Sequence, residues 1–393
     1  MATVISGAAP RGRLATGPLA GALLLLAAGA WLALDAAGPR MAALFLVGGL
    51  LGATLYHASF GFTSAWRRLV VERDGRGLRA QMAMLAVAVL LFFPALAAGE
   101  IFGQPLSGNL APLGTSVVVG AFIFGIGMQL GGGCASGTLY TAGGGSTRML
   151  LTLAGFIAGS VVATSHLGFW FTLPSLPPVS VVTSLGLGPA LLVNLALFAV
   201  IAAVAWRIDA KRGTAGPAGS SRPNLLRGPW PILWGALALA VLNFVTLLLA
   251  GRPWGVTSAF ALWGAKILDA LGGDVAFWDY WAAPAQTAAL QASVWTDITS
   301  VMDFGIVGGA LLAAILAGRF RPRLNLSRAD VLTAIIGGLM LGYGARLAYG
   351  CNIGAYFSGI ASGSLHGWLW LVAAFAGSWV GTRLRPVCGL PRV

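Results

Sequence analysis

Two cysteines in matching glycine-rich segments are the residues of this sequence best suited to chemistry. Residues 125–137 read GIGMQLGGGCASG and residues 342–354 read GYGARLAYGCNIG, so Cys134 and Cys351 occupy equivalent positions. Glycine lets a backbone break from helical geometry and approach a ligand closely. A thiol is a weak hydrogen-bond donor with a polarisable sulfur, which suits a sulfur-bearing ligand better than a hard oxyanion. The repeat therefore predicts two thiols that face one route from opposite sides.

Polar groups and glycines extend this candidate site. Broken helices leave backbone N–H groups unpaired, and a helix N-terminus attracts anions. A weaker repeat pairs residues 61–65, GFTSA, with residues 255–259, GVTSA, whose hydroxyls are either substrate contacts or only helix caps. The predicted substrate-binding residues are Cys134, Cys351, Gly133, Gly350, Gly137, Gly354, Ser136, Asn352, Thr63, Ser64, Thr257 and Ser258.

Basic residues beside the loops form a second set of candidates. Charge within a membrane points to function by default, and the alternative is snorkelling or interfacial anchoring. The cysteines have an alternative too, as small apolar fillers. The predicted anion-attracting residues are Arg148, Arg252, Lys266 and Arg346.

Several chemical classes are disfavoured by the motifs that the sequence does not contain. No Cys/His cluster has metal-ligand spacing, so neither a metal nor a cofactor is predicted. No phosphate-binding loop or hydrolase motif occurs, so the chain is not expected to be an enzyme. Cys388 follows the last apolar run and is given no role.

Composition indicates the elements that must position these residues. Hydrophobic residues make up 58% and charged residues only 9%, which excludes an ordinary soluble domain. The net charge of +13 lies in short loops, where it sets membrane orientation. Long apolar runs reach the roughly 20-residue spanning length. The predicted spans, about ten, are 17–36, 41–57, 80–99, 115–131, 147–165, 187–206, 230–250, 301–318, 330–348 and 366–384.

The distribution of arginine and lysine predicts orientation and domains. With ten spans, every basic loop falls on one side, and the Lys/Arg-free stretches 101–114, 167–186 and 270–300 fall on the other. The basic side is cytoplasmic by the positive-inside rule, so both termini are predicted there. The predicted domains are a cytoplasmic tail (1–16), a first membrane half with the Cys134 loop (17–206), a cytoplasmic linker (207–229), a second half with the Cys351 loop (230–385) and a tail (386–393).

These assignments place equivalent loops of the two halves on opposite sides of the membrane. The predicted fold class is therefore an all-α polytopic membrane protein with two inverted repeats and broken or re-entrant helices, a recurring plan among secondary transporters. Irregular backbone at membrane depth persists where it is buried in protein or lines a cavity. The four glycine-containing loops are the expected broken segments.

At residues 131–140, GGGCASGTLY, and 350–359, GCNIGAYFSG, the chain resembles the YeeE/YedE family of sulfur-transport membrane proteins. The resemblance runs from about Gly17 to Thr382 and implies a multi-pass transporter of the bacterial inner membrane. It implies uptake of thiosulfate or a related sulfur anion, with Cys134 and Cys351 holding the ion through S–H contacts. It also implies a TusA-like cytoplasmic sulfur-carrier protein as partner.

The sequence departs from this family in one motif and leaves alternatives open. Family members often carry a cysteine in the first-half loop, where this chain reads SFGFTSAW over residues 59–66. Some relatives are linked to selenium metabolism, so a selenium-compound transporter is one alternative. A membrane-embedded thiol enzyme or sulfurtransferase that forms a persulfide is another. A membrane protein that only docks a soluble sulfur carrier is a third.

The sequence also gives an expectation about energy coupling. Moving one negative charge inward against 100 mV costs about 2.3 kcal/mol. No carboxylate or histidine lies within the motifs, and Glu100, Asp269 and Asp303 fall near the ends of predicted spans. Passage is therefore expected to be facilitated and drawn inward by consumption of the anion.

Overall fold

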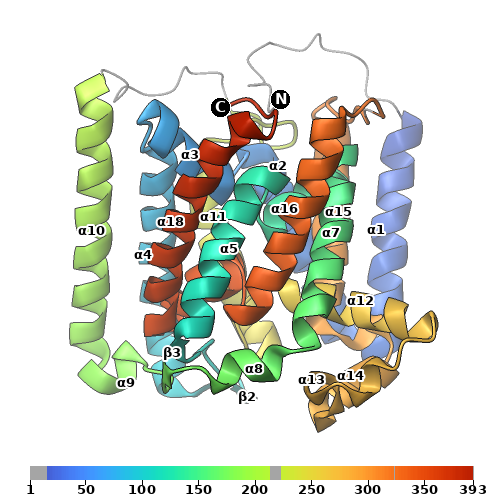
Figure 1. The fold of residues 1–393 in the computed structure, drawn as a ribbon, viewed down its shortest axis with the longest axis horizontal. Helices are drawn as coiled ribbons and strands as arrows, with labels where there is room; N and C mark the ends of the chain where they lie inside the picture. Colours follow the sequence, from blue (N-terminus) through green and yellow to red (C-terminus); the bar gives the residue numbers. More distant parts are fainter. Residues whose placement is uncertain (1–15, 213–222, 323, 393) are drawn as a thin grey trace.

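Long helices dominate the computed structural model, which describes residues 16–212, 223–322 and 324–392. In these ranges ten helices have 17 residues or more, and they run roughly side by side (Figure 1). They are α1 (Thr16–Ala37), α2 (Pro39–Ala58), α4 (Arg76–Ala98), α5 (Thr115–Gly131), α7 (Thr147–Thr164), α10 (Leu187–Arg212), α11 (Ile232–Ala250), α15 (Ile298–Leu316), α16 (Arg328–Leu347) and α18 (Leu365–Val387).

Short elements connect the long helices or lie among them. Four of them matter for the site: α3 (Phe62–Glu72), α6 (Ala135–Gly143), α12 (Thr257–Ala270) and the π-helical turn η3 (Asn352–Phe357), which continues into α17 (Ser358–Ala361). The others are β1 (Glu100–Ile101), β2 (Gln104–Pro105), β3 (Leu113–Gly114), α8 (Leu167–Thr172), β4 (Ser175–Leu176), α9 (Val181–Leu185), η1 (Val275–Phe277), α13 (Asp279–Ala282), α14 (Pro284–Gln291) and η2 (Val294–Thr296). The strands form two antiparallel pairs, β1 with β2 and β3 with β4.

The prediction of a polytopic helical membrane protein is confirmed. Every predicted span falls on one of the long helices, and nine helical segments of the described chain are long and apolar enough to cross a membrane. The tenth predicted span corresponds to α18, which has 23 residues but is not among those nine. Residues 1–15 of the predicted tail and 213–222 of the predicted linker lie outside the described residues.

Glycines bring neighbouring helices into backbone contact. A side chain at Gly305 or Gly309 of α15 would collide with the backbone of α2, and one at Gly48 would collide with α15 in return. The same holds where Gly120 of α5 faces Gly344 of α16. Small residues at helix contacts are the usual means of close packing in membrane proteins, and they hold the long helices as a tight frame.

The packing partners come in matching pairs. Helix α5 packs on α18, and α16 packs on α7; α2 packs on α15, and α11 packs on α4. Helix α5 also packs on α16, and α2 on α11. The same set of contacts results when each helix is exchanged with its counterpart in the other half. The counterparts are α2 and α11, α4 and α15, α5 and α16, and α7 and α18. In Figure 1, α3 lies near the end that carries both termini, whereas α12 lies near the opposite end.

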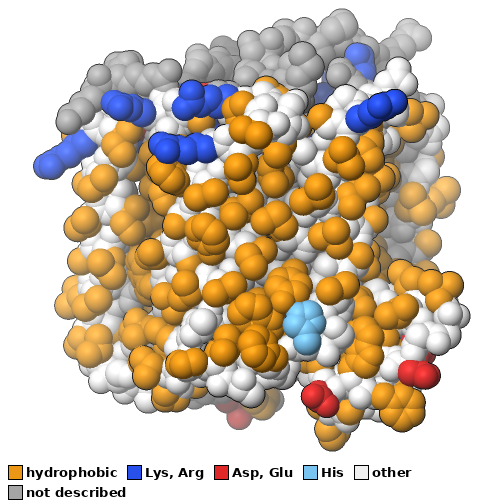
Figure 2. Space-filling model, in the orientation of Figure 1, with side chains coloured by type: hydrophobic (Ala, Val, Ile, Leu, Met, Phe, Trp, Pro, Cys, Tyr) orange, Lys and Arg blue, Asp and Glu red, His pale blue; other side chains and the backbone are white. Residues whose placement is uncertain are grey.

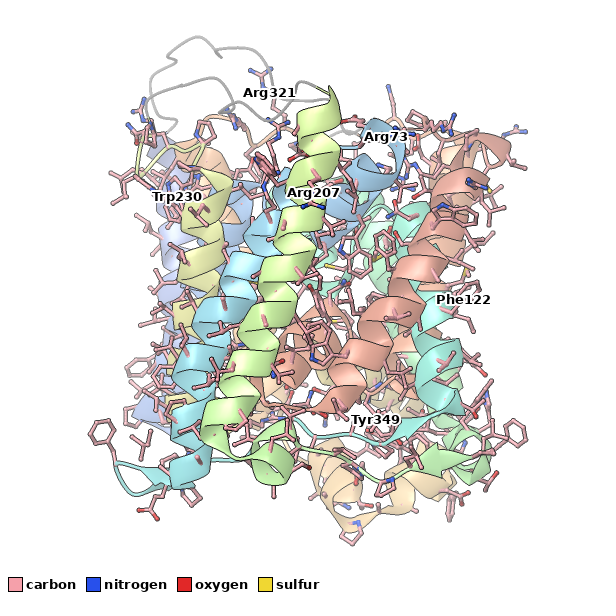
Figure 3. All side chains as sticks on the ribbon, turned by 90° about the vertical axis from the view of Figure 1, so that its left-hand side faces the viewer. Arg73, Phe122, Arg207, Trp230, Arg321 and Tyr349 are labelled. Carbon is pink, nitrogen blue, oxygen red and sulfur yellow. The ribbon has the colours of Figure 1, made fainter. Side chains whose placement is uncertain are left out.

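Charge is divided between the two ends of the bundle. Figure 2 shows lysine and arginine side chains gathered at the end that carries the termini, and acidic side chains at the other. Arg73, Arg207 and Arg321 lie towards the first of these ends in Figure 3. Asp274 and Asp279 are exposed near α13, at the second. We call these the basic end and the acidic end.

Candidate functional site

Each predicted thiol belongs to the residue just before a short helix in the interior of the bundle. Cys134 is the N-cap of α6, and Cys351 is the N-cap of η3. Both side chains are buried. The N–H of Ile353 donates to Sγ of Cys351 at 3.4 Å, and Sγ of Cys134 lies 3.5 Å from Oγ of Ser136. Both sulfurs therefore sit where a helix presents unpaired N–H groups.

The two cysteine loops meet in space. Helix α6 contacts η3, and the two sulfurs lie near enough for a charge on one to act on the other. Segments more than 200 residues apart in the sequence thus form one site. The structure brings together Cys134 and Cys351 as the repeat predicts, and their contact with a substrate stays a prediction.

The paired glycines of the two loops differ in their surroundings. Gly350 has φ +146°, and a Cβ there would lie 2.8 Å from the backbone nitrogen of Ala355. A Cβ on Gly137 would lie 3.4 Å from Sγ of Cys134, whereas one on Gly354 would meet no described atom within 4 Å. Gly133 is also tight, against the backbone of Thr138. Open space therefore borders η3 at Gly354.

Buried polar groups without partners lie in the turn that follows Cys351. Neither amide atom of Asn352 nor the hydroxyl of Tyr356 forms a hydrogen bond with any described residue, and both side chains are fully buried. Leaving such a group unsatisfied costs about 1–3 kcal/mol. Buried orphan groups mark a place for water or a ligand, so η3 presents donors and acceptors beside the Cys351 thiol.

Aromatic rings enclose this polar turn. The ring of Tyr356 stacks on the ring of Trp370, with centroids 6.3 Å apart. The ring of Phe62 packs edge-on against the ring of Tyr356, with centroids 5.9 Å apart. Trp66 and Phe124 extend the cluster. These rings exclude water, and a dry surrounding strengthens every electrostatic contact made within it.

The two predicted threonine–serine pairs lie at the starts of α3 and α12, two helices that lie towards opposite ends of the bundle (Figure 1). Neither pair caps its helix through a side chain. Oγ of Ser64 donates to the carbonyl of Gly61 at 3.2 Å, while no described group bonds the hydroxyl of Thr63. Thr257, which begins α12, is buried, whereas Ser258 is exposed. The caps-only alternative therefore has no support in the hydrogen bonds.

Ser258 and Arg252 form a polar cluster at the acidic end. Oγ of Ser258 donates to Oγ1 of Thr299 at 3.0 Å, and Arg252 donates to the same oxygen at 3.2 Å. Ser258 and Arg252 are exposed, whereas Thr299, near the start of α15, is buried. We call these three residues the Thr299 mouth, because they join the surface to the buried face of α15.

The other predicted cations have partners within the protein. Arg148 donates to the carbonyls of Leu130 and Gly131 at 2.7 and 2.8 Å, which satisfies the C-terminal end of α5. It also forms an ion pair with Asp330 at 3.4 Å.

Lys266 donates to the carbonyl of Ala292 at 2.7 Å, and Arg346 donates to the hydroxyl of Tyr280 at 3.3 Å. These contacts connect α12 and α16 to the segment between α12 and α15, which contains Tyr280 and Ala292. Of the four predicted cations, only Arg252 reaches the Thr299 mouth in the described contacts.

A buried glutamine cluster near the basic end was not predicted. Gln129 of α5 donates to the carbonyl of Thr63 at 3.1 Å and to Oγ of Ser378 at 2.8 Å. Arg67 donates to its side-chain oxygen at 3.4 Å, and Arg385 donates to its backbone carbonyl at 2.6 Å. The only sign of this cluster in the sequence was Gln129 itself, a single glutamine within the apolar run 115–131.

A multi-pass helical bundle in which two short helices meet at buried thiols has the architecture of a membrane transport protein. The comparison with known families agrees, since the family described as sulphur transport matches residues 57–380. The chain belongs to this sulphur transport family. The prediction of YeeE/YedE membership is confirmed, and the family indicates a transporter instead of an enzyme.

Several curated relatives carry transporter names. The thiosulfate transporter TsuA of Spirochaeta thermophila is 30% identical over 350 residues, which covers 85% of this chain and 96% of that protein. TsuA of Escherichia coli is 28% identical, covering 86% of this chain and 93% of that protein. The probable transporter YedE of Escherichia coli is 36% identical over 164 residues. That match covers 41% of this chain and spans 40% of the length of YedE.

Proposed function

We propose that the protein takes up thiosulfate or a related sulfur-containing anion through a central route between the two cysteine loops. The observation that carries the proposal is the meeting of α6 and η3 at Cys134 and Cys351. The curated relatives that match most of the chain are named as thiosulfate transporters. An anion fits the backbone N–H groups of the two short helices, and its terminal sulfur fits a neutral thiol, because a thiolate would repel it.

Two halves related by inversion are part of this proposal. The matched packing pairs and the opposite positions of α3 and α12 fit two halves related by inversion (Figure 1). On this reading the basic end faces the cytoplasm of a bacterial inner membrane and holds both termini. The acidic end then faces outward, and α3, α6, α12 and η3 are the broken or re-entrant segments.

The route begins at the Thr299 mouth. Arg252 offers the incoming anion a positive charge, and Ser258 offers a hydroxyl. The thiols and the orphan amide of Asn352 lie deeper, where the anion exchanges water for S–H and N–H donors. Near the basic end, Gly61 approaches the hydroxyl of Tyr140, which stands on the helix that follows Cys134. Beyond Arg252, this order lets a dianion pass between partial positive charges without a further fixed counter-charge.

Uptake by cysteine variants tests the proposal. Cys134→Ala and Cys351→Ala each remove one S–H donor, so both should abolish growth on thiosulfate as sole sulfur source. Cys388→Ala is the matched control, because this cysteine lies just beyond α18 and away from both loops. Membrane fractions should contain all three variants in equal amount. Normal growth of both loop variants would remove the thiol mechanism.

Two alternatives have distinguishing results. A sulfurtransferase would leave a stable persulfide on Cys134 or Cys351 that turns over, and mass spectrometry after exposure to thiosulfate detects it. A selenium-compound transporter would lose labelled-thiosulfate uptake to excess selenite but not to sulfate or sulfite. Competition by unlabelled thiosulfate alone argues against the selenium reading.

The basic end offers a docking surface for a TusA-like sulfur carrier. Arg68, Arg73 and Arg207 are exposed there, and charge complementarity favours an acidic partner. Reversing Arg68 and Arg73 to glutamate should weaken co-purification with such a carrier and leave uptake into vesicles unchanged. Equal co-purification of the wild type and the reversed variant would contradict this docking site.

A further inference from the structure

One carboxyl group stands inside the bundle without a partner. Asp303 lies on α15, one turn beyond its start, and its side chain is fully buried. No described residue hydrogen-bonds either of its oxygens. The three ion pairs of the described chain involve Asp74, Asp209 and Asp330 instead. The sequence placed Asp303 near the end of a span, and the structure buries it where α2 packs against α15, with Gly48 against Met302 and Gly52 against Ile306.

Asp303 lies on the same face of α15 as Thr299, one turn further into the helix. Thr299 and Asp303 are four residues apart on α15, so they share one face of the helix. That face continues to Val307, whose carbonyl packs against Gly143 of α6. At the inner end, Asp303 and Cys351 are close enough for their charges to act on each other. The carboxyl group therefore borders the route of the proposed anion.

The ionisable groups on and around α15 do not neutralise the negative charge of the Asp303 carboxylate. Asp297, at the N-cap of α15, adds a second negative charge and bonds Ser300. None of the groups on the neighbouring helices forms a described hydrogen bond or ion pair with Asp303. Those groups are Asp35 of α1, Arg40, Tyr56 and His57 of α2, Cys134 and Tyr140 beside or within α6, and Lys266 and Asp269 of α12.

We propose that Asp303 is a proton-binding site that couples an inward proton to the inward anion, an inference that rests on the proposed function. A bare carboxylate in a dry interior is strongly disfavoured, and the structure offers it no cation. A proton satisfies one oxygen with no further ligand, whereas a metal cation such as sodium requires a shell of several oxygen ligands.

The charge balance of the cycle is explicit. At the acidic end, a proton from solvent binds one carboxylate oxygen of Asp303, and the anion binds at the thiols. Both leave at the basic end, the O–H bond of Asp303 breaks, and the carboxylate returns empty. One thiosulfate dianion and one proton carry a net charge of −1 inward, in place of −2 for the anion alone. The sequence-based expectation of passage drawn by consumption of the anion is the alternative to this coupling.

Proteoliposomes at zero membrane potential test the coupling. With one coupled proton, each unit of pH by which the outside is more acidic should raise the equilibrium accumulation of labelled thiosulfate about tenfold. Asp303→Asn keeps the shape of the side chain and should lose this response, while exchange of internal for external thiosulfate continues. Asp269→Asn is the matched control, an exposed carboxyl on adjacent α12, and should respond as the wild type does.

A second measurement examines the site without any substrate. Infrared spectra of the purified protein at neutral pH should contain a protonated-carboxyl band that Asp303→Asn removes and Asp269→Asn retains. Loss of thiosulfate exchange in the wild type would overturn the proposed function, and the infrared band would still decide the proton site. Accumulation that ignores the pH gradient, accumulation driven by a sodium gradient instead, or absence of the band would each overturn the proton-coupling proposal.

Discussion

Gly350, the residue before the second thiol, allows a sharp test of the loop geometry. Its φ of +146° is a conformation that residues with a side chain rarely adopt, and a Cβ there would lie 2.8 Å from the backbone nitrogen of Ala355. The strained backbone costs about 1–3 kcal/mol, and overpacking against a rigid turn costs about another 1–3 kcal/mol. Gly350→Ala should therefore destabilise the protein by about 2–6 kcal/mol.

Gly354, four residues later, is the matched control. A Cβ there meets no described atom within 4 Å, so Gly354→Ala should change stability by no more than about 0.5 kcal/mol. Thermal unfolding in detergent at one scan rate, followed by tryptophan fluorescence, ranks the two variants against the wild type. Coincident melting of Gly350→Ala and Gly354→Ala would refute the loop geometry.

Three further predictions concern other parts of the molecule. Gly354→Leu fills the open space beside η3, so labelled-thiosulfate uptake should fall at least about tenfold with near-normal melting; full uptake would place the route elsewhere. Gln129→Leu removes the side-chain acceptor of Arg67 and should lower the free energy of unfolding by about 2–5 kcal/mol. Gln129→Glu keeps an acceptor and should restore part of this stability. An unchanged melting temperature in Gln129→Leu would contradict the prediction. Hydrogen bonds from Arg76 hold the pKa of Asp74, between α3 and α4, below its usual 3.8. That stabilisation is complete above the unfolded-state pKa and is lost as pH falls through the lower folded-state pKa. Acidification below about pH 4 should therefore destabilise the wild type more than Asp74→Asn, and parallel melting curves would count against it.

The long helices could be predicted from the sequence because apolar runs of spanning length are local signals. The pairing of Cys134 with Cys351 could be predicted as well, since an internal repeat places equivalent residues in equivalent positions. The short helices were expected only as broken segments. Their lengths depend on what packs against them, as where α6 ends against the backbone of α15 at Gly143.

Long-range contacts account for the residues that the sequence did not reveal. From the sequence, Asp303 appeared only as a residue near the end of a span. Its burial could not be predicted, because hydropathy does not show which face of a helix packs against a neighbouring helix. Gln129 gained its role from Arg67 of α3 and from Ser378 and Arg385 of α18, two segments that are distant from it in the sequence. Arg148 looked like an anion-attracting residue, and its guanidinium donates to two carbonyls at the end of α5.

Backbone contact at glycines has a mechanical consequence for the transport cycle. A slide of one residue along α2 or α15 moves a helix by about 1.5 Å and drives side chains into the space that Gly48 and Gly305 leave to the backbone. The long-helix frame is therefore stiff, and we expect the opening and closing motion to belong to α3, α6, α12 and η3. The two halves then need not rock against each other. A disulfide engineered between α2 and α15 should leave uptake intact, and loss of uptake would show that the frame moves.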